Sequence, residues 1–391
     1  MNSNDIFQLI KLDTDRYISF LANICSFEAR AYDKAEIDRM VDYIEAFTRS
    51  EGFEVTRTPF ETCGDFLTID LNPGASKAGF LLAHLDTVHD KGVFGTPPVK
   101  IVDDRMIGPG TVDCKGGVAV ALLMMRALLK SGYPYHVRMI LTTDEEISNV
   151  LGGEKEQQFI RDQVSGFPFA LNCELTENNE VAVARKGILR YQINIHGKGG
   201  HSGQRYFESK NAVLETAHKI IALESASKKD NISYSCNVIH GGAAPNAIPD
   251  ECQFIVDIRS ASQAGMQEAE NYVQQITAKS FIGDTSASAT LLSKRPPMER
   301  REETMALFHR LNALSRQYGL GELTATEPGG GSDSAYTQAA GVLSICGLGP
   351  SGKDYHTPRE YVELDSIPRR AKLLAALLID QCTYLNQEVT Q

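Results

Sequence analysis

His84 and Asp86, in the first quarter of the chain, have the spacing of a metal ligand and the group that orients it. Histidine is the commonest metal ligand in proteins when its ring is neutral. A carboxylate two residues later can accept a hydrogen bond from the other ring nitrogen, which fixes the tautomer and makes the imidazole more basic. Short polar pairs also arise by chance, so this pair alone is a weak signal.

Further acidic residues and a second histidine follow along the chain: Asp113, the pair Glu145-Glu146, Glu174 and His356. The acidic pair and Glu174 each come directly after an apolar run that we expect to be a strand. Binding sites in open α/β sheets lie at such strand ends, so these side chains should converge. Imidazole and carboxylate are typical zinc ligands, and two ions about 3.5–4 Å apart need a carboxylate that bridges them. The alternative, ordinary buried histidines and solvated acids, suits any one of these residues but not the whole set.

The elements that would position these residues alternate between helix and strand. Amphipathic helices are expected over 13–30 and 35–51, and a helix that is apolar nearly all round over 116–130. The expected strands are 53–58, 66–71, 78–83, 137–143 and 169–173. Continuous apolar runs such as 78–83 are typical of strands that are buried on both faces. The pattern predicts an α/β fold.

Near Lys186-Gly187 the pattern changes to strict alternation, which begins with the strand 188–196. The elements that follow are a helix 211–223, strands 232–239 and 252–259, a helix 264–279 and a strand 287–293. The order β-α-β-β-α-β is that of a ferredoxin-like α+β sandwich. We therefore expect two domains: a discontinuous catalytic domain, 1–186 and 296–391, and an inserted domain, 187–295.

Composition narrows the class of protein. A length of 391 residues favours two domains, and a net charge of −11 without a long basic cluster argues against nucleic acid as a partner. No stretch is long and apolar enough to suggest a membrane span. Eight scattered cysteines, and an N-terminus without the pattern of a signal peptide, favour a cytoplasmic protein with reduced thiols.

On these motifs the chain resembles the di-zinc metallopeptidases that include glutamate carboxypeptidase, acetylornithine deacetylase, succinyl-diaminopimelate desuccinylase, aminoacylase and tripeptidase. The resemblance covers nearly the whole chain and implies a three-layer zinc-peptidase catalytic domain. It implies that Asp113 bridges two zinc ions, that His84 and Glu174 complete one site, and that Glu146 and His356 complete the other. Asp86 would be the partner of His84. The family pattern often has a cis peptide after the bridging aspartate, here Asp113-Cys114.

Glu145 is the candidate catalytic base. It stands next to a ligand and reaches the same cavity without being used by the metal. Zinc lowers the pKa of a bound water, and a nearby carboxylate can take its proton and deliver it to the leaving nitrogen. The alternative is that Asp144-Glu145-Glu146 is an ordinary charged loop, as most acidic triplets are. Its place after an expected strand, together with the resemblance, favours the catalytic role.

Other residues match the family's substrate site. His201, in the Gly-rich run Gly197–Gly203, would hydrogen-bond the oxyanion, often across a dimer interface. Asn246 and Arg259 match the substrate clamp, although Arg259 could instead form a structural ion pair with Asp257 or Glu251. Backbone N–H groups of the loop Gly329, Gly330 and Gly331 could hold a substrate carboxylate. The alternative for Asp333 is the role of a helix N-cap.

The expected function is hydrolysis of an amide or peptide bond next to a free carboxylate. The resemblance implies that Glu at position 174 is typical of carboxypeptidases and deacylases, whereas aminopeptidases tend to carry Asp. Substrates would be small peptides or N-acyl amino acids, the cofactors two Zn²⁺ ions with Co²⁺ or Mn²⁺ possible, and the assembly a homodimer. Two alternatives stay open: a di- or tripeptide aminopeptidase, and an inert metal-binding relative that serves as a binding or scaffold protein.

Overall fold

The computed structural model describes residues 2–389, and the chain divides into two compact units. The first unit runs to Ala184, resumes over Arg300–Glu327 and continues from Ser332. The second consists of Arg185–Glu299 and Pro328–Gly331. The short segment Pro328–Gly331 was expected in the catalytic domain, but the structure places it with the inserted unit.

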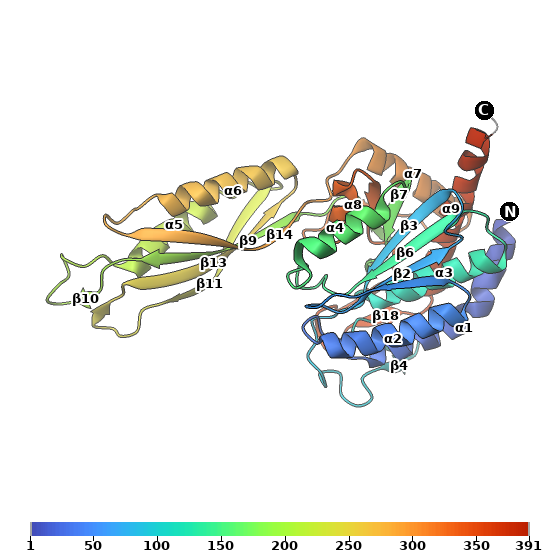
Figure 1. Cartoon of the computed structure of the whole chain (residues 1–391), viewed down its shortest axis with the longest axis horizontal. Coiled ribbons are helices and arrows are strands. Elements are labelled where there is room, and N and C mark those ends of the chain that lie inside the picture. Colours follow the sequence, from blue (N-terminus) through green and yellow to red (C-terminus); the bar gives the residue numbers. More distant parts are fainter. Residues whose placement is uncertain (1, 390–391) are drawn as a thin grey trace. The chain divides into compact units, whose positions relative to one another are not determined.

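The first unit is built on a six-stranded sheet (Figure 1). Its strand order is β1 (Glu54–Thr58), β2 (Phe66–Leu71), β6 (His136–Thr142), β3 (Lys77–His84), β7 (Phe169–Asn172) and β16 (Leu343–Ile345). The four strands β6, β3, β7 and β16 are parallel, while β1 and β2 are antiparallel additions at one edge. Parallel strands buried on both faces explain why their sequences are nearly continuous apolar runs.

Helices cover both faces of this sheet and make three layers. They are α1 (Ser3–Ser26), α2 (Lys34–Ser50), α3 (Lys115–Lys130), α4 (Gly153–Val164), α7 (Glu302–Gln317), α8 (Ser334–Ala339) and α9 (Ser366–Val389). Alternate residues of β3 show the two cores, because successive side chains of a strand point to opposite faces. Leu81 packs in the larger core with α1, α3 and α9, whereas Phe80 packs in a second core with α4 and α8.

The structure differs from the sequence-based expectation in two respects. The first helix was expected over 13–30 but spans Ser3–Ser26, because the side chain of Asn2 accepts a hydrogen bond from the Asn4 N–H and caps it. The sequence also does not predict several short strands, because they are only two or three residues long. They form the sheet β17 (Gly352–Lys353), β18 (Tyr361–Glu363), β5 (Arg105–Ile107), β4 (Lys100–Val102), and the pair β15 (Thr324–Thr326), β8 (Glu180–Ala182).

The second unit has the predicted β-α-β-β-α-β order. Its elements are β9 (Gly187–His196), α5 (Ala212–Ser225), β11 (Ile232–Gly241), β13 (Glu251–Ser260), α6 (Gln263–Ala278) and β14 (Ser286–Arg295), with a short pair β10 (Gly200–His201) and β12 (Ala247–Ile248). The sheet order β11-β13-β9-β14, antiparallel throughout, confirms the ferredoxin-like sandwich. Helices α5 and α6 cover one face of this sheet (Figure 1). Among the described residues, no helix of either unit is long and apolar enough to span a bilayer.

Candidate metal centre

Three neighbouring parallel strands bring most of the predicted ligands to one edge of the large sheet. His84 ends β3 and pairs with Thr142, the last residue of β6, so Glu145 and Glu146 follow immediately beside it. On the other side, Leu82 pairs with Asn172 at the end of β7, and Glu174 comes two residues later. The carboxyl ends of the strands therefore position one histidine and three carboxylates, as the sequence predicts.

Asp113 reaches the same edge because the start of α3 packs very closely against the end of β7. A Cβ atom at Gly117 would lie only 1.8 Å from the carbonyl oxygen of Cys173, so glycine is required at this contact. The Asp113–Cys114 peptide bond is cis, as the resemblance implies. The helix start thus carries the Asp113 carboxylate up to the strand ends.

The carboxylate of Asp113 lies between two histidines. Its Oδ1 is 3.2 Å from His84 Nε2, and its Oδ2 is 3.4 Å from His356 Nε2. His356 Nε2 is also 3.1 Å from Glu146 Oε2. Each oxygen of one carboxylate therefore faces a different imidazole, which is the arrangement expected of a ligand that bridges two ions.

Glu145 and Glu174 complete the group on the His84 side. Ligand atoms of His84, Glu145 and Glu174 lie within 4.8 Å of one another, and so do those of His84, Asp113 and Glu146. The structure thus brings all five predicted ligands together, and we call them the ligand cluster: His84, Asp113, Glu146, Glu174 and His356. Glu145 lies beside this cluster and is only 8 % exposed.

Asp86 does more than the sequence suggested. His84 Nδ1 lies 3.1 Å from the carbonyl oxygen of Asp86 and 3.4 Å from its Oδ1. The fully buried carboxylate of Asp86 also accepts the backbone N–H groups of Glu145, at 3.2 Å, and of Glu146, at 3.0 Å. One side chain therefore fixes both the first histidine and the turn that carries the candidate base.

Burial and close charges shift the protonation of the cluster strongly. Burial, together with the charge of Asp113, raises the pKa of Glu146 to about 8. Hydrogen bonds to Asp113 and Glu146 raise the pKa of His356 to about 10. Although burial opposes it, hydrogen bonds from His356 and His84 hold the pKa of Asp113 well below its usual range. The histidine and carboxylate groups are linked by hydrogen bonds through these protons. A cation that binds here would displace the protons.

The chemistry of the cluster fits divalent metal ions. Imidazole and carboxylate donors are the expected partners of zinc, and the two oxygens of Asp113 point to two separate sets of donors. The cluster is therefore able to hold a metal.

In the second unit, the structure brings His201 and Asn246 together. His201 pairs with Ala247 across β10 and β12, and Ser202 donates from its backbone N–H to the carbonyl oxygen of Asn246 at 3.0 Å. His201 is exposed, and its Nδ1 accepts the N–H of Gly203 at 3.2 Å. Both predicted residues thus lie on one Gly-rich corner of this unit.

Arg259 lies elsewhere in the same unit. It is eight residues along β13 from Glu251, roughly 26 Å at the rise of an extended strand, so it does not approach Asn246 within its unit. Its guanidinium binds Asp257 with both Nε and Nη2, the second at 3.1 Å, and Arg190 also binds Asp257, at 2.8 Å. The structural ion pair that the sequence left open is therefore present.

The Gly-rich loop Gly329, Gly330 and Gly331 lies at the Arg259 end of the sheet. A Cβ at Gly331 would meet Ile188 at 2.7 Å and Arg295 at 3.1 Å. Ile188 pairs with Arg259 on one side and with Arg295 on the other, so these three side chains share one face of the sheet. The loop and Arg259 thus belong to one end of the second unit.

Asp333 does not act as a helix cap. It stands at the N-cap position of α8, but its side chain makes no capping hydrogen bond. Instead its carboxylate accepts hydrogen bonds from Thr142 Oγ1 at 2.9 Å and from Asn149 Nδ2 at 3.2 Å. The residue therefore links α8 to the end of β6 and to the turn that follows Glu146.

Sequence reasoning missed several residues that support the cluster, above all Glu360 and His89. The sequence offered no carboxylate context for His89, because its partner Glu360 is 271 positions away. The only local signal for Glu360 is its place four residues after His356. Glu360 accepts the backbone N–H groups of Val112 and Asp113, so it holds the loop of the bridging aspartate.

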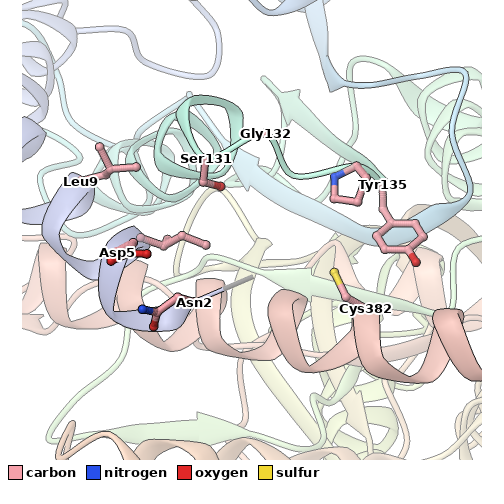
Figure 2. A pocket seen from close by; sticks show the side chains of 9 residues that line it. Asn2, Asp5, Leu9, Ser131, Gly132, Tyr135 and Cys382 are labelled. Carbon is pink, nitrogen blue, oxygen red and sulfur yellow. The ribbon is translucent and has the colours of Figure 1, made fainter.

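A separate pocket of about 460 Å³ lies elsewhere in the first unit. Figure 2 shows it between the start of α1, the turn after α3 and a turn of α9, with Asp5, Ser131 and Cys382 among its lining residues. It contains none of the residues of the ligand cluster, and one carboxylate and one thiol are too few donors for the chemistry expected here.

Comparison with known proteins agrees with this geometry. The model of the family "Peptidase family M20/M25/M40" matches residues 80–380. Carboxypeptidase G2 from Pseudomonas sp. (strain RS-16) is 26% identical over 386 residues, which cover 96% of this chain and 92% of that protein. Succinyl-diaminopimelate desuccinylase from Rickettsia akari (strain Hartford) is 23% identical and aligns over 66% of this chain and 72% of its own.

Among solved structures, a tripeptidase from Staphylococcus aureus subsp. aureus Mu50 has the same fold. Its TM-score is 0.78 at 18% sequence identity, with 94% of this chain and 98% of that chain covered. The family match spans well over half of the sequence and includes every residue of the ligand cluster. The chain therefore belongs to peptidase family M20/M25/M40, and it is a metal-dependent hydrolase of this family.

Proposed function

We propose that this protein is a zinc-dependent carboxypeptidase or N-acyl-amino-acid deacylase, which cleaves an amide bond next to a free carboxylate. The observation that carries the proposal is the placement of Asp113 between His84 and His356, with Glu145 beside them. The similarity to carboxypeptidase G2 over almost the whole chain supports this substrate class. So does the glutamate at position 174, which the resemblance associates with carboxypeptidases and deacylases.

In the proposed centre, Asp113 would be shared between two zinc ions, His84 and Glu174 would hold one of them, and Glu146 and His356 would hold the other. When bound, the ions supply Lewis acidity at the scissile carbonyl and lower the pKa of a water molecule. Co²⁺ or Mn²⁺ would suit the same donors. The order of metal affinities alone does not decide which of these ions is bound.

The chain's own residues perform the proton transfers. Glu145 takes a proton from the attacking water and returns it to the leaving nitrogen, a role that needs a carboxylate beside the cluster but not used as a ligand. Asp86 keeps Glu145 in place through its backbone N–H, at 3.2 Å. His201 donates a hydrogen bond to the oxyanion of the tetrahedral intermediate.

Arg259 and the loop Gly329–Gly331 bind the substrate carboxylate. Asn246 lies beside His201 at the other end of the second unit, so it would contact the substrate from the partner copy of the homodimer proposed below. A guanidinium offers a planar pair of donors that suits a carboxylate, and arginines surround this loop: Arg185 Nη1 lies 3.7 Å from a Cβ position at Gly330, and Arg295 adjoins Gly331. The part of Arg259 that Asp257 leaves exposed is available to a ligand.

We also propose a homodimer formed through the second unit. Strand β11 is an edge strand of its sheet, and it exposes Val238 and Ile239; on the adjacent α5, Leu214 and Ile221 are 44% and 63% exposed. An edge with apolar side chains favours pairing with another chain. Sedimentation should give a dimer at micromolar concentration, and a fully active monomer would exclude a role of His201 in the partner's site.

A cytoplasmic location is part of the same proposal. All eight cysteines are free thiols, and seven of them are buried. Structural disulfides are rare in reducing compartments, so this thiol content fits the cytoplasm. Cell fractionation would test it, and recovery of the protein with the periplasmic or secreted fraction would contradict it.

The direct test of the function is hydrolysis of matched substrates by the purified, zinc-loaded protein. N-acyl amino acids and dipeptides with a free carboxylate should be cleaved, and the same compounds with an amidated C-terminus should not. A chelator should remove activity, and zinc should restore it. Cleavage that needs a free amine but not the carboxylate would instead identify an aminopeptidase. Tight zinc binding with no turnover on any substrate would favour a scaffold protein.

The role of Arg259 has a matched control in Arg190, which binds the same Asp257 from the neighbouring strand. Arg259→Met should raise KM for substrates with a free carboxylate by about tenfold or more, because a charged hydrogen bond contributes about 1.5–3 kcal/mol. Arg190→Met should leave KM unchanged. Equal effects of the two substitutions would mean that both arginines only stabilise the sheet.

A further inference from the structure

Glu360 is a buried carboxylate that contacts the ligand cluster through the backbone of Asp113 and not through a ligand side chain. It is 1% exposed, and it lies four residues after His356. Its Oε1 accepts the backbone N–H groups of Val112, at 3.0 Å, and of Asp113, at 3.1 Å. Its Oε2 accepts a hydrogen bond from His89 Nε2 at 2.8 Å.

These contacts join the three segments that carry His84, Asp113 and His356. His89 comes five residues after His84 on the same loop, and its ring packs edge-on against Phe94 with centroids 4.8 Å apart. The backbone of Glu360 makes two more links, because its carbonyl accepts the Gly108 N–H and its N–H donates to Thr357. One residue therefore connects the loops of both histidines and of the aspartate between them.

Both carboxylate oxygens of Glu360 are used within this arrangement, so it is not itself a candidate metal ligand. A charged acceptor makes stronger hydrogen bonds than a neutral one, and two consecutive N–H groups on one oxygen fix the direction of the peptide that leads into Asp113. Removing such an acceptor from a buried place leaves the N–H groups unsatisfied. The orientation of the Asp113 side chain thus depends on Glu360.

We propose that Glu360, with His89 as its partner, is a positioning residue that holds the three ligand-bearing loops in register and thereby sets the affinity of the protein for its metal ions. The inference rests on the metal centre proposed above. Groups that orient metal ligands from outside typically contribute about 10–100-fold to metal affinity.

The chain offers a matched control in a second buried carboxylate–histidine pair. Asp70 Oδ1 accepts His136 Nε2 at 2.7 Å, and both residues are buried in the first unit. His136 begins β6 while Thr142 ends it, so the pair lies roughly 20 Å from the ligand cluster at the rise of a strand. Glu360→Gln and Asp70→Asn make the same chemical change, from carboxylate to amide beside a histidine.

The experiment measures zinc affinity of the full chain, stripped of metal, by competition with a chromophoric chelator. Circular dichroism and thermal unfolding first confirm that each variant is folded. Glu360→Gln should weaken zinc binding by about 10–100-fold. Asp70→Asn should lower thermal stability but leave zinc affinity at the wild-type value.

A second substitution keeps the proposal testable if Glu360→Gln does not fold. His89→Leu leaves Glu360 and its two backbone contacts in place but removes the link to the His84 loop, so it should weaken zinc binding less than the loss of the carboxylate. Folded variants at both positions with wild-type affinity would overturn the role of Glu360, and so would an equal loss in Asp70→Asn. Wild-type protein that binds no zinc would instead overturn the metal centre itself.

Discussion

Asp113 is the residue with the most demanding position, because both of its oxygens must face imidazoles from different parts of the chain. Its own helix start, the strand end of His84 and the loop of His356 meet there. The ligand types and their places after apolar runs were predictable from the sequence. The supports were not, because the N–H groups that Asp86 holds are 59 and 60 positions away, and the partner of His89 is 271 positions away.

The first prediction concerns Glu145. Glu145→Gln keeps the size of the side chain but removes the base, so kcat should fall by about 10²–10⁴-fold. Zinc content, measured by mass spectrometry, should stay at the wild-type level, because Glu145 is not a ligand in the proposed centre. Loss of zinc together with activity would show that Glu145 binds a metal. Glu154→Gln, at an exposed residue of α4, provides the control.

At the scale of elements, hydrogen bonds of Asn149 hold the turn after β6 in place. This residue has a φ of 57°, in the left-handed region that Asn tolerates better than most residues. Its Nδ2 donates to Glu156 Oε1 at 2.8 Å and to Asp333, and its Oδ1 accepts the hydroxyl of Tyr336 at 3.0 Å. The amide therefore connects α4 and α8 to the turn that carries Glu145.

The second prediction follows from the need for donors at this position. Asn149→Asp keeps shape and backbone preference but places a carboxylate against two others, and it should lower the free energy of unfolding by about 2–3 kcal/mol. Urea denaturation measures the effect. Asn178→Asp makes the same change at an exposed residue with a φ of 45° and should have little effect. Equal stability of Asn149→Asp and the wild type would mean that the turn does not need the amide.

In the second unit, a buried ion pair joins α5 and α6. Lys219 Nζ lies 3.1 Å from Glu215 Oε1 and donates to the carbonyl oxygen of Ile276 at 2.7 Å, near the end of α6. Glu215 also accepts the backbone N–H groups of Phe281 and Ile282. Although burial opposes it, these N–H groups and Lys219 lower the pKa of Glu215. The Glu215 carboxylate therefore stabilises the fold at pH values above the pKa that Glu215 has in the unfolded chain.

The third prediction is the pH dependence of this contribution. Glu215→Gln should destabilise the second unit by about 2–3 kcal/mol at pH 7, seen as faster hydrogen exchange of its amides. Because the folded pKa is lowered, the difference from wild type should shrink only as the pH falls below about 4. A difference that is constant from pH 7 to pH 3 would contradict the role of the charge. Glu268→Gln, in an exposed pair with Lys228, should have little effect at any pH.

The elements themselves were predicted unevenly. Long apolar strands such as β3 and the buried helix α3 can be predicted from their sequence patterns. Both are buried on nearly all sides, so nearly all of their side chains are apolar. The start of α1 was misplaced by ten residues because its cap, Asn2, precedes a first turn with few apolar residues. Strands of two or three residues, such as β17, carry no detectable period and exist only because other segments pair with them.

At the scale of the whole molecule, the division into two units follows the change from buried parallel strands to alternating antiparallel ones. The sequence predicts this change at Lys186-Gly187; in the structure, the first compact unit runs to Ala184 and the second begins at Arg185. The sequence could not locate Pro328–Gly331 in the second unit, because that placement depends on contacts with Ile188 and Arg295 from distant strands. Close approach of glycine to a partner leaves no mark on the pattern of apolar residues.

The central claim is that distant segments of one unit form a site for two metal ions with Asp113 between them. Diffraction from zinc-soaked crystals at the zinc absorption edge tests it most directly. Two anomalous peaks about 3.5–4 Å apart should appear at the Asp113 carboxylate, one beside His84 and one beside His356. Peaks elsewhere in the molecule, with none at Asp113, would contradict the claim.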